Sequence, residues 1–158
     1  MKWWLAGLGV LGFMAYKFKP VALVRGVRNN NPGNIRSTVS DYWEGQIGTD
    51  GSFAIFESPE FGIRAMGRTL MNYDRLYGLN TVSEIISRWA PSNENNTEAY
   101  IDAVADELGV FTFWPLDLND ADRLTQLIKA IIKHENGIQP YSDDLIARGV
   151  RLAGESFA

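Results

Sequence analysis

The stretch LTQLIKAIIKHENG, residues 124–137, decides the fold of this chain. Its apolar residues recur at the spacing of one helix face, and they are Leu124, Leu127, Ile128, Ile131 and Ile132. Glu135 continues this apolar stripe one turn later, and Gly137 is a typical residue for ending a helix. The pattern therefore predicts an amphipathic helix that packs on a core and carries an acid at its C-terminal end.

Four further helices are predicted from residues that cap helix starts and from glycine or proline at their ends. They are expected over residues 59–77 after Ser58, 81–89 with Thr81 and Glu84 as a capping box, 95–108 with Asn95 and Glu98, and 142–154 from Ser142. Asn119 with Asp122 is expected to open the helix that carries Glu135.

Strand-like segments lie near Asp41–Ile47 and Ser52–Phe56. The pair Asp50–Gly51 between them favours a tight hairpin turn, because both residues tolerate the backbone angles of such a turn. The fold class predicted from the whole pattern is mainly α with a small β-hairpin.

Composition excludes several kinds of site. Hydrophobic residues make up 46% of the chain and charged residues 22%, which is enough to form a packed core. The net charge of −4 argues against nucleic acid as a partner. The chain has no cysteine, and His134 is its single histidine, so a disulfide framework, thiolate metal sites and multi-histidine metal centres are excluded. We expect no metal and no cofactor.

The N-terminal segment differs from the rest of the chain. From Trp3 to Tyr16 it is apolar and uncharged, with Lys2 before it and Lys17 after it. This pattern predicts a transmembrane anchor over residues 1–19, in which tryptophan and lysine lie at the membrane interface. A linker is expected over residues 20–28 and a catalytic domain over 29–158. A cleaved signal peptide and a buried core helix are the alternatives for the first segment.

Glu135 is the first candidate catalytic residue. At the end of an apolar stripe it is expected to be partly desolvated and near the negative end of the helix dipole, and both effects favour the protonated form. A protonated carboxylic acid can give its proton to the leaving oxygen of a glycosidic bond. The alternative is a solvated glutamate at a helix end, paired with Lys133 or Arg148.

Three segments carry a resemblance to known families. Residues 127–141, LIKAIIKHENGIQPY, resemble the catalytic helix of lytic transglycosylases and bacterial glucosaminidases. NNPGNI (30–35), WEG (43–45) and FAIF (53–56) resemble the hairpin region of the glucosaminidases. Residues 25–141 as a whole resemble a group of phage and prophage virion-associated proteins. The resemblance implies a lysozyme-like α+β domain, circularly permuted, because in those families the catalytic helix precedes the hairpin.

What the resemblance implies about function is a membrane-anchored, virion-associated enzyme of the lytic transglycosylase kind. It would cleave peptidoglycan glycan strands and open the bacterial wall locally when the phage genome enters the cell. The implied partners are peptidoglycan, a lipid membrane of the virion or the host, and other virion proteins. Hydrolysis instead of transglycosylation stays open, as does a non-enzymatic virion protein with a glycan-binding domain.

Glu44 is the competing acid, because it lies between Trp43 and Gly45 at the hairpin with Asp50 six residues later. A solvated hairpin carboxylate is its alternative. Glycan binding requires aromatic faces and amide groups in a groove. The candidates for this role are Asn30, Asn31, Asn34, Trp43, Trp89, Asn95, Tyr100 and Tyr141, each of which could instead have a packing, turn or capping role.

Overall fold

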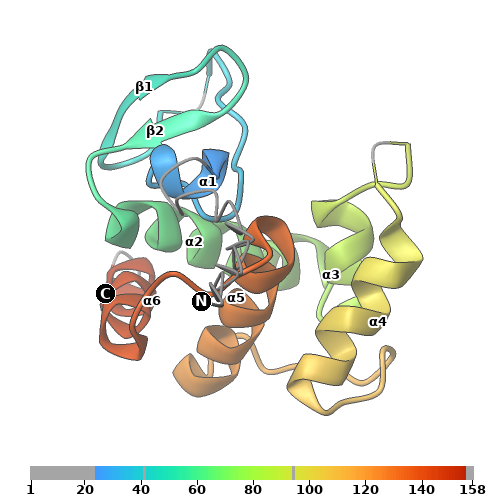
Figure 1. Ribbon diagram of the computed structural model, residues 1–158. Coiled ribbons are helices and arrows are strands. Elements are labelled where there is room, and N and C mark those ends of the chain that lie inside the picture. Colours follow the sequence, from blue (N-terminus) through green and yellow to red (C-terminus); the bar gives the residue numbers. More distant parts are fainter. Residues whose placement is uncertain (1–23, 41, 94, 156–158) are drawn as a thin grey trace, which may run out of the picture.

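The computed structural model of this chain describes residues 24–40, 42–93 and 95–155 (Figure 1). Its elements in chain order are α1 (Arg25–Arg28), β1 (Gln46–Thr49), β2 (Ala54–Phe56), α2 (Pro59–Tyr77), α3 (Val82–Trp89), α4 (Thr97–Leu108), α5 (Ala121–Asn136) and α6 (Asp143–Glu155). The predicted class, mainly α with a small β-hairpin, is confirmed.

The hairpin forms where the Asp50–Gly51 pair predicted it. Strands β1 and β2 are antiparallel, with Thr49 opposite Ala54 and an irregularity between Gln46 and Gly48. The Asp50 carboxylate accepts hydrogen bonds from the backbone N–H groups of Ser52 and Phe53, which holds the turn. The predicted first strand, 41–47, was placed too early, because β1 covers residues 46–49.

The helix boundaries follow the capping chemistry of the sequence. Pro59 occupies the first position of α2, and Gly78 ends that helix in the left-handed conformation at φ 65°. Thr81 and Glu84 form the predicted capping box of α3. For α4 and α5 the capping residues are one position later than predicted, and they are Asn96 and Asp120.

The predicted linker over residues 20–28 differs from the structure at residues 25–28, which are helical. They form the single helical turn α1, in which Gly26 is buried. A Cβ atom at Gly26 would lie 2.5 Å from the Asn136 side-chain oxygen and 3.1 Å from the Asn31 carbonyl oxygen. This turn therefore forms where the chain packs closely against the end of α5, which local sequence does not reveal.

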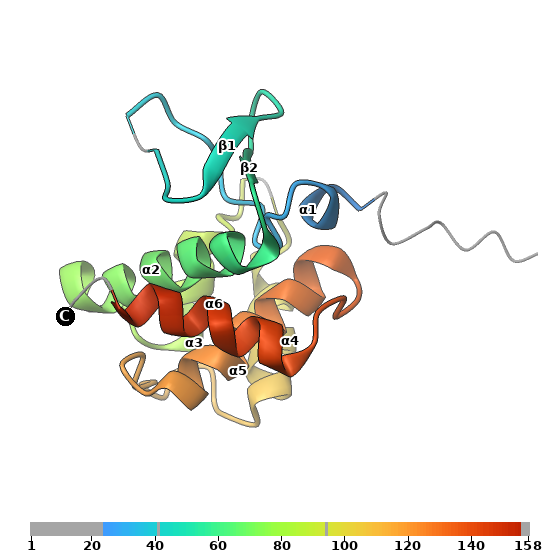
Figure 2. The same cartoon turned by 90° about the vertical axis from the view of Figure 1, so that its left-hand side faces the viewer.

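Helix α5 lies between α6 and α4, and α2 runs alongside α6 (Figures 1 and 2). Small residues allow the close contact between α2 and α6: a Cβ atom at Gly67 would lie 2.7 Å from that of Ala153. The apolar stripe of α5 is buried at the centre of the main core, as predicted from the 124–137 pattern. Burial of this stripe fixes which way α5 faces, and with it the position of Glu135.

A smaller apolar cluster of Ala54, Phe56 and Ala65 joins the hairpin to α2. Among residues 24–40, 42–93 and 95–155, none of the helices has the length and apolar character needed to cross a membrane. The predicted anchor over residues 1–19 lies outside the described residues.

Candidate functional site

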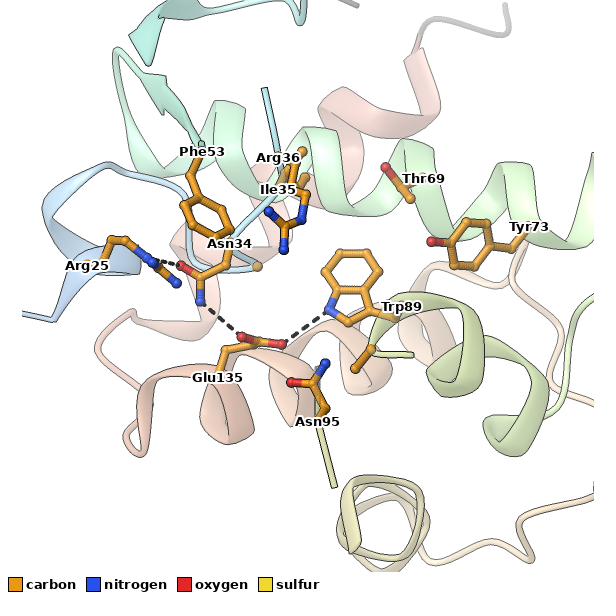
Figure 3. A pocket seen from close by; sticks show the side chains of 12 residues that line it. Arg25, Asn34, Ile35, Arg36, Phe53, Thr69, Tyr73, Trp89, Asn95 and Glu135 are labelled. Carbon is orange, nitrogen blue, oxygen red and sulfur yellow. Dashed lines mark hydrogen bonds between the residues drawn. The ribbon is translucent and has the colours of Figure 1, made fainter. Parts of the chain in front are cut away.

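Three side chains from different parts of the fold converge on the carboxylate of Glu135. The Asn34 side-chain amide donates to Oε2 at 2.9 Å, and the Tyr100 hydroxyl donates to Oε1 at 2.9 Å. The Trp89 indole N–H donates to Oε1 at the longer distance of 3.4 Å. Figure 3 shows Asn34 and Trp89 approaching the carboxylate from opposite sides. Glu135 is therefore held by residues 29–34 (NNNPGN), which we call the asparagine-rich loop, by α3 and by α4.

The end of α5 is tied to the asparagine-rich loop by its neighbour Asn136. The buried Asn136 side-chain amide donates to the carbonyl oxygens of Pro32 and Ile132, at 2.9 and 2.8 Å. Asn34 adopts the left-handed conformation at φ 49°, which asparagine tolerates better than most residues. Together these features direct the Asn34 amide towards Glu135.

Gly33 allows the loop to pass close to α2 and α3. A Cβ atom at this position would lie 2.7 Å from Met66 Cγ and 2.9 Å from Trp89 Cζ2. Such distances are shorter than real side chains tolerate, so the loop requires glycine here. Gly33 thus lets the loop pass close to the Trp89 ring immediately before Asn34.

Tyr100 is a buried side chain that holds Glu135 through its hydroxyl group. Its side chain is 2% exposed, and its ring stacks on that of His134 with centroids 3.6 Å apart. Burial, and then the negative charge of Glu135, raise the pKa of the Tyr100 phenol far above its ordinary value. The hydroxyl therefore keeps its proton and acts as a permanent hydrogen-bond donor to Glu135.

A pocket of about 370 Å³ opens beside Glu135. It is of the size of small-ligand sites. Its walls come from the asparagine-rich loop, the hairpin, α1, α2, α3 with the segment after it, and the end of α5. The residues that line it are Arg25, Gly33, Asn34, Ile35, Arg36, Phe53, Thr69, Tyr73, Trp89, Ala90, Asn95 and Glu135. Glu135 is the acidic side chain among these described lining residues.

The other end of the pocket carries two cations around one aromatic ring. The Arg25 guanidinium carbon lies 3.8 Å from the centroid of the Phe53 ring, and that of Arg36 lies 5.3 Å from it. Arg25 Nε also donates to Asn34 Oδ1 at 3.4 Å. Asn34 therefore connects the acidic end of the pocket to its cationic end (Figure 3).

The structure brings part of the predicted site together. Asn34, Trp89 and Asn95 line the pocket with Glu135, whereas Tyr100 contacts Glu135 without lining the pocket. These positions agree with the predicted grouping, and their roles in binding substrate stay predictions.

The other four predicted binding residues lie away from the pocket at Glu135. The Asn31 side chain is fully buried and bonds to the backbone of Ile35 and Ala54. Asn30 donates to the Phe56 carbonyl oxygen. Trp43 packs on the hairpin cluster and Tyr141 on the main core. None of these four described residues lines the pocket at Glu135.

Glu44, the competing acid, lies outside the pocket as well. Its side chain is 61% exposed and forms an ion pair with the Arg64 guanidinium. Arg64 itself is largely buried on α2, so the pair joins the hairpin region to that helix. This corresponds to the alternative interpretation of Glu44, a solvated carboxylate at the hairpin.

Sequence reasoning missed the cationic end and the α2 wall of the pocket, formed by Arg25, Arg36, Phe53, Thr69 and Tyr73. Arg25 and Phe53 fall within the stretches that carry the family resemblance, so those stretches contained the signal. Thr69 and Tyr73 are one turn apart on α2 and give no local signal of facing a pocket. Across the described part of the chain, no group of three or more His, Cys, Asp or Glu residues could hold a metal ion.

The fold and the pocket define a small, mainly helical protein with an acid held by three donors beside a polar cavity. No protein-family model matches the chain. Protein P5 of Pseudoalteromonas phage PM2 is 40% identical to it over 151 residues, which cover 92% of this chain and 91% of that protein. The chain therefore belongs to the family of protein P5 of phage PM2. This relative supports the association with phage that the sequence predicted.

Proposed function

We propose that this protein cleaves the glycan strands of peptidoglycan, as a lytic transglycosylase-like enzyme with a lysozyme-like fold, and that Glu135 is its acid and base. The observation that carries the proposal is the position of Glu135. Its carboxylate lies on the wall of a polar pocket of about 370 Å³, and protein donors fix its orientation. Amide and indole groups, which suit sugar hydroxyls and sugar faces, surround it.

A transglycosylation needs one carboxyl group. Glu135 gives its proton to the glycosidic oxygen as the bond from that oxygen to C1 of the muramic acid breaks. The C6 hydroxyl of the same muramic acid then attacks C1, and its proton returns to Glu135 as the 1,6-anhydro ring closes. The proton balance is restored after each turnover without water. Glu135 is the acid among the described lining residues, which favours this route over hydrolysis.

The three donors have separate roles in this cycle. A carboxyl group that donates a proton accepts fewer hydrogen bonds than a carboxylate. The contact from Trp89, at 3.4 Å, is the longest of the three. We propose that the glycosidic oxygen of the substrate displaces this contact and binds Glu135 in its place. Asn34 and Tyr100, both at 2.9 Å, keep the group oriented.

The family relationship to a phage protein gives the activity a setting. An enzyme carried in the virion and held on a membrane by residues 1–19 would open the wall locally while the phage genome enters the cell.

The test compares the purified protein with its Glu135→Gln variant on isolated cell-wall sacculi. Mass spectrometry of the released fragments should find anhydromuramic ends with the parent protein. The variant should lose activity by about 10²- to 10⁴-fold, the usual share of general acid–base catalysis. Glu44→Gln is the matched control, because that exposed side chain lies outside the pocket. Undiminished activity of Glu135→Gln, with its circular dichroism unchanged, would remove Glu135 from the mechanism.

A second candidate function is a glycan-binding virion module without catalysis. The specific observation in its favour is that three protein donors already occupy the oxygens of Glu135. A carboxylate in such a network can serve to join α5 to the loop, α3 and α4. Such a protein would sediment with sacculi but release no soluble fragment from them.

A further inference from the structure

The wall of the pocket on α2 presents two hydroxyl groups one helical turn apart. Thr69 and Tyr73 both line the pocket from this helix. Long side chains on a helix lean towards its N-terminal end, so the Tyr73 phenol extends back over the turn that carries Thr69. Figure 3 shows the hydroxyl end of Tyr73 directed towards the side of the pocket where Thr69 and Trp89 lie. In the same view Trp89 lies between Tyr73 and Glu135, so the α2 wall is a polar region apart from the acid.

The hydroxyl group of Thr69 is fixed as a hydrogen-bond acceptor towards a ligand. It donates its one proton to the backbone carbonyl oxygen of Ala65 at 2.9 Å, a bond to the preceding turn that threonine often makes in a helix. The lone pairs of the hydroxyl oxygen can still accept a hydrogen bond. A ligand group beside Thr69 should therefore offer a donor.

The hydroxyl group of Tyr73 has the opposite polarity. Burial raises the pKa of the phenol, although Arg88 opposes this through its charge and through a hydrogen bond to the phenol, so Tyr73 keeps its proton at neutral pH. The Arg88 guanidinium carbon lies 5.2 Å from the Tyr73 ring centroid and 4.1 Å from that of Tyr77. Arg88 is not among the residues that line the pocket in the described chain. Because it bonds to the phenol oxygen from outside the pocket, the O–H group of Tyr73 can donate into it.

An acceptor and a donor one turn apart favour a particular kind of ligand group. Cβ atoms at this helical spacing lie about 5–6 Å from each other. A sugar hydroxyl donates and accepts through one oxygen atom, whereas a trans secondary amide carries its N–H and C=O at opposite sides of a planar group. The amide therefore fits a donor and an acceptor that lie apart. Ile35 and Ala90, which also line the pocket, suit the carbon substituent of such an amide.

We infer that Thr69 and Tyr73 form a subsite for one secondary amide group, in which Thr69 accepts from the N–H and Tyr73 donates to the C=O. Peptidoglycan offers this group in two places, the acetamido groups of its amino sugars and the peptide bonds of its stems. The inference rests on the proposed function for the identity of the ligand, but binding of an amide at α2 does not require cleavage at Glu135.

The experiment measures equilibrium binding to the full chain by NMR titration with three probes. They are a tetrasaccharide of N-acetylglucosamine, a tetrasaccharide of glucose, in which a hydroxyl replaces each acetamido group, and a free stem peptide. If the acetamido group is the ligand, the first sugar should bind about fivefold or more tightly than the second, the effect of one or two neutral hydrogen bonds. If a peptide bond is the ligand, the free peptide should bind and the two sugars should not differ.

Two variants each remove one hydroxyl group and keep the shape of the side chain. Tyr73→Phe and Thr69→Val should each weaken binding of the amide-bearing probe by about two- to tenfold and leave the glucose tetrasaccharide unchanged. Thr69→Ser keeps the acceptor and should retain most of the parent affinity. The matched controls are Tyr77→Phe, one turn further along α2, and Thr125→Val, which loses the same kind of helix bond on α5. Neither control residue lines the pocket.

Two results would overturn the inference. The first is a parent protein that binds both sugars equally and does not bind the peptide. The second is an unchanged affinity for the amide-bearing probe in both Tyr73→Phe and Thr69→Val. Loss of affinity for the acetamido sugar and loss of affinity for the peptide both support the subsite, and they identify which amide it takes.

The outcomes for cleavage and for amide recognition are distinguishable. A protein that selects an amide-bearing probe through Thr69 and Tyr73 but releases no fragment from sacculi refutes the proposed enzymatic function and keeps the subsite. A protein that cleaves sacculi, binds both sugars equally and does not bind the peptide keeps the enzymatic function and refutes the subsite.

Discussion

Replacing Tyr100 by phenylalanine removes one hydroxyl group and leaves the rest of the side chain in place. That hydroxyl donates to Glu135 at 2.9 Å, in a side chain that is 2% exposed. The phenylalanine ring can still stack on His134 and pack in the main core. The substitution therefore isolates a single, partly buried hydrogen bond that holds the candidate catalytic group.

The expected loss of stability at neutral pH follows from the kind of bond. Removing one partner of a hydrogen bond inside a protein costs about 1–3 kcal/mol, and Tyr100→Phe should lower the free energy of unfolding by about that amount. Phenylalanine leaves no unpaired group of its own. Glu135 retains its hydrogen bonds from Asn34 and Trp89, which limits the loss to this range.

The same substitution changes the response to alkaline pH. Burial, with the charge of Glu135 as the second cause, raises the pKa of Tyr100 above its ordinary value of about 10. Below about pH 10 the hydroxyl is protonated in both the folded and the unfolded state, so its contribution is fully present. Above that pH only the unfolded state loses the proton, and stability falls by about 1.4 kcal/mol per pH unit for this one group.

Two other tyrosines act in the same direction. Burial raises the pKa of Tyr141 to about 12, and burial also raises that of Tyr73. Tyr100→Phe should therefore reduce the alkaline slope of stability by the share of one tyrosine and leave the rest. The assay is denaturant unfolding followed by circular dichroism from about pH 8 to about pH 11, which brackets the ordinary tyrosine pKa.

Tyr42→Phe is the control, because the Tyr42 side chain is 77% exposed and its replacement should change stability by less than about 0.5 kcal/mol. The reasoning is refuted if Tyr100→Phe is as stable as the parent protein at pH 7 and loses stability with the same slope above pH 10.

Two further predictions test the fold around the site and the first segment of the chain. A Cβ atom at Gly62 would overlap the backbone carbonyl oxygen of Asn30. Gly62→Ala should therefore destabilise the fold by about 1–3 kcal/mol, the usual cost of overpacking, and lower the melting temperature. Gly154→Ala should not, because a Cβ atom there would have nothing within 4 Å. Deleting residues 1–19 should release the protein from lipid vesicles in a flotation assay; continued flotation of the shortened chain would contradict the predicted anchor.

Much of the fold could be predicted because its determinants are local. The stripe from Leu124 to Ile132 specifies both a helix and its buried face, and Thr81 with Glu84 specifies the start of α3. Helix α1 could not be predicted, since a single turn has too few internal hydrogen bonds to be stable alone. It depends on the contact between Gly26 and Asn136, residues that lie far apart in the sequence.

The candidate site was predicted less completely, for a related reason. Glu135 could be found because it continues an apolar stripe that fixes its direction. The asparagines between residues 29 and 34 have the same chemistry, and only their positions in the folded chain decide which one faces the pocket. Asn31 is directed inwards to the backbone of Ala54. Asn30 and Asn34 share a left-handed backbone, at φ 50° and 49°, yet Asn30 bonds to the Phe56 carbonyl oxygen and Asn34 to Glu135. Sequence alone does not distinguish these outcomes.

The order of the elements along the chain does not determine how the site assembles. Asn34 and Glu135 are 101 positions apart, and their hydrogen bond depends only on where the folded core places the loop and the end of α5. Closing a loop of this length costs about 4 kcal/mol of chain entropy, more than one such hydrogen bond contributes. Burial of the α5 stripe against the other helices must supply the difference. The geometry of the pocket is therefore a consequence of the core, which brings the asparagine-rich loop and the acid-bearing end of α5 together although they lie far apart in the sequence.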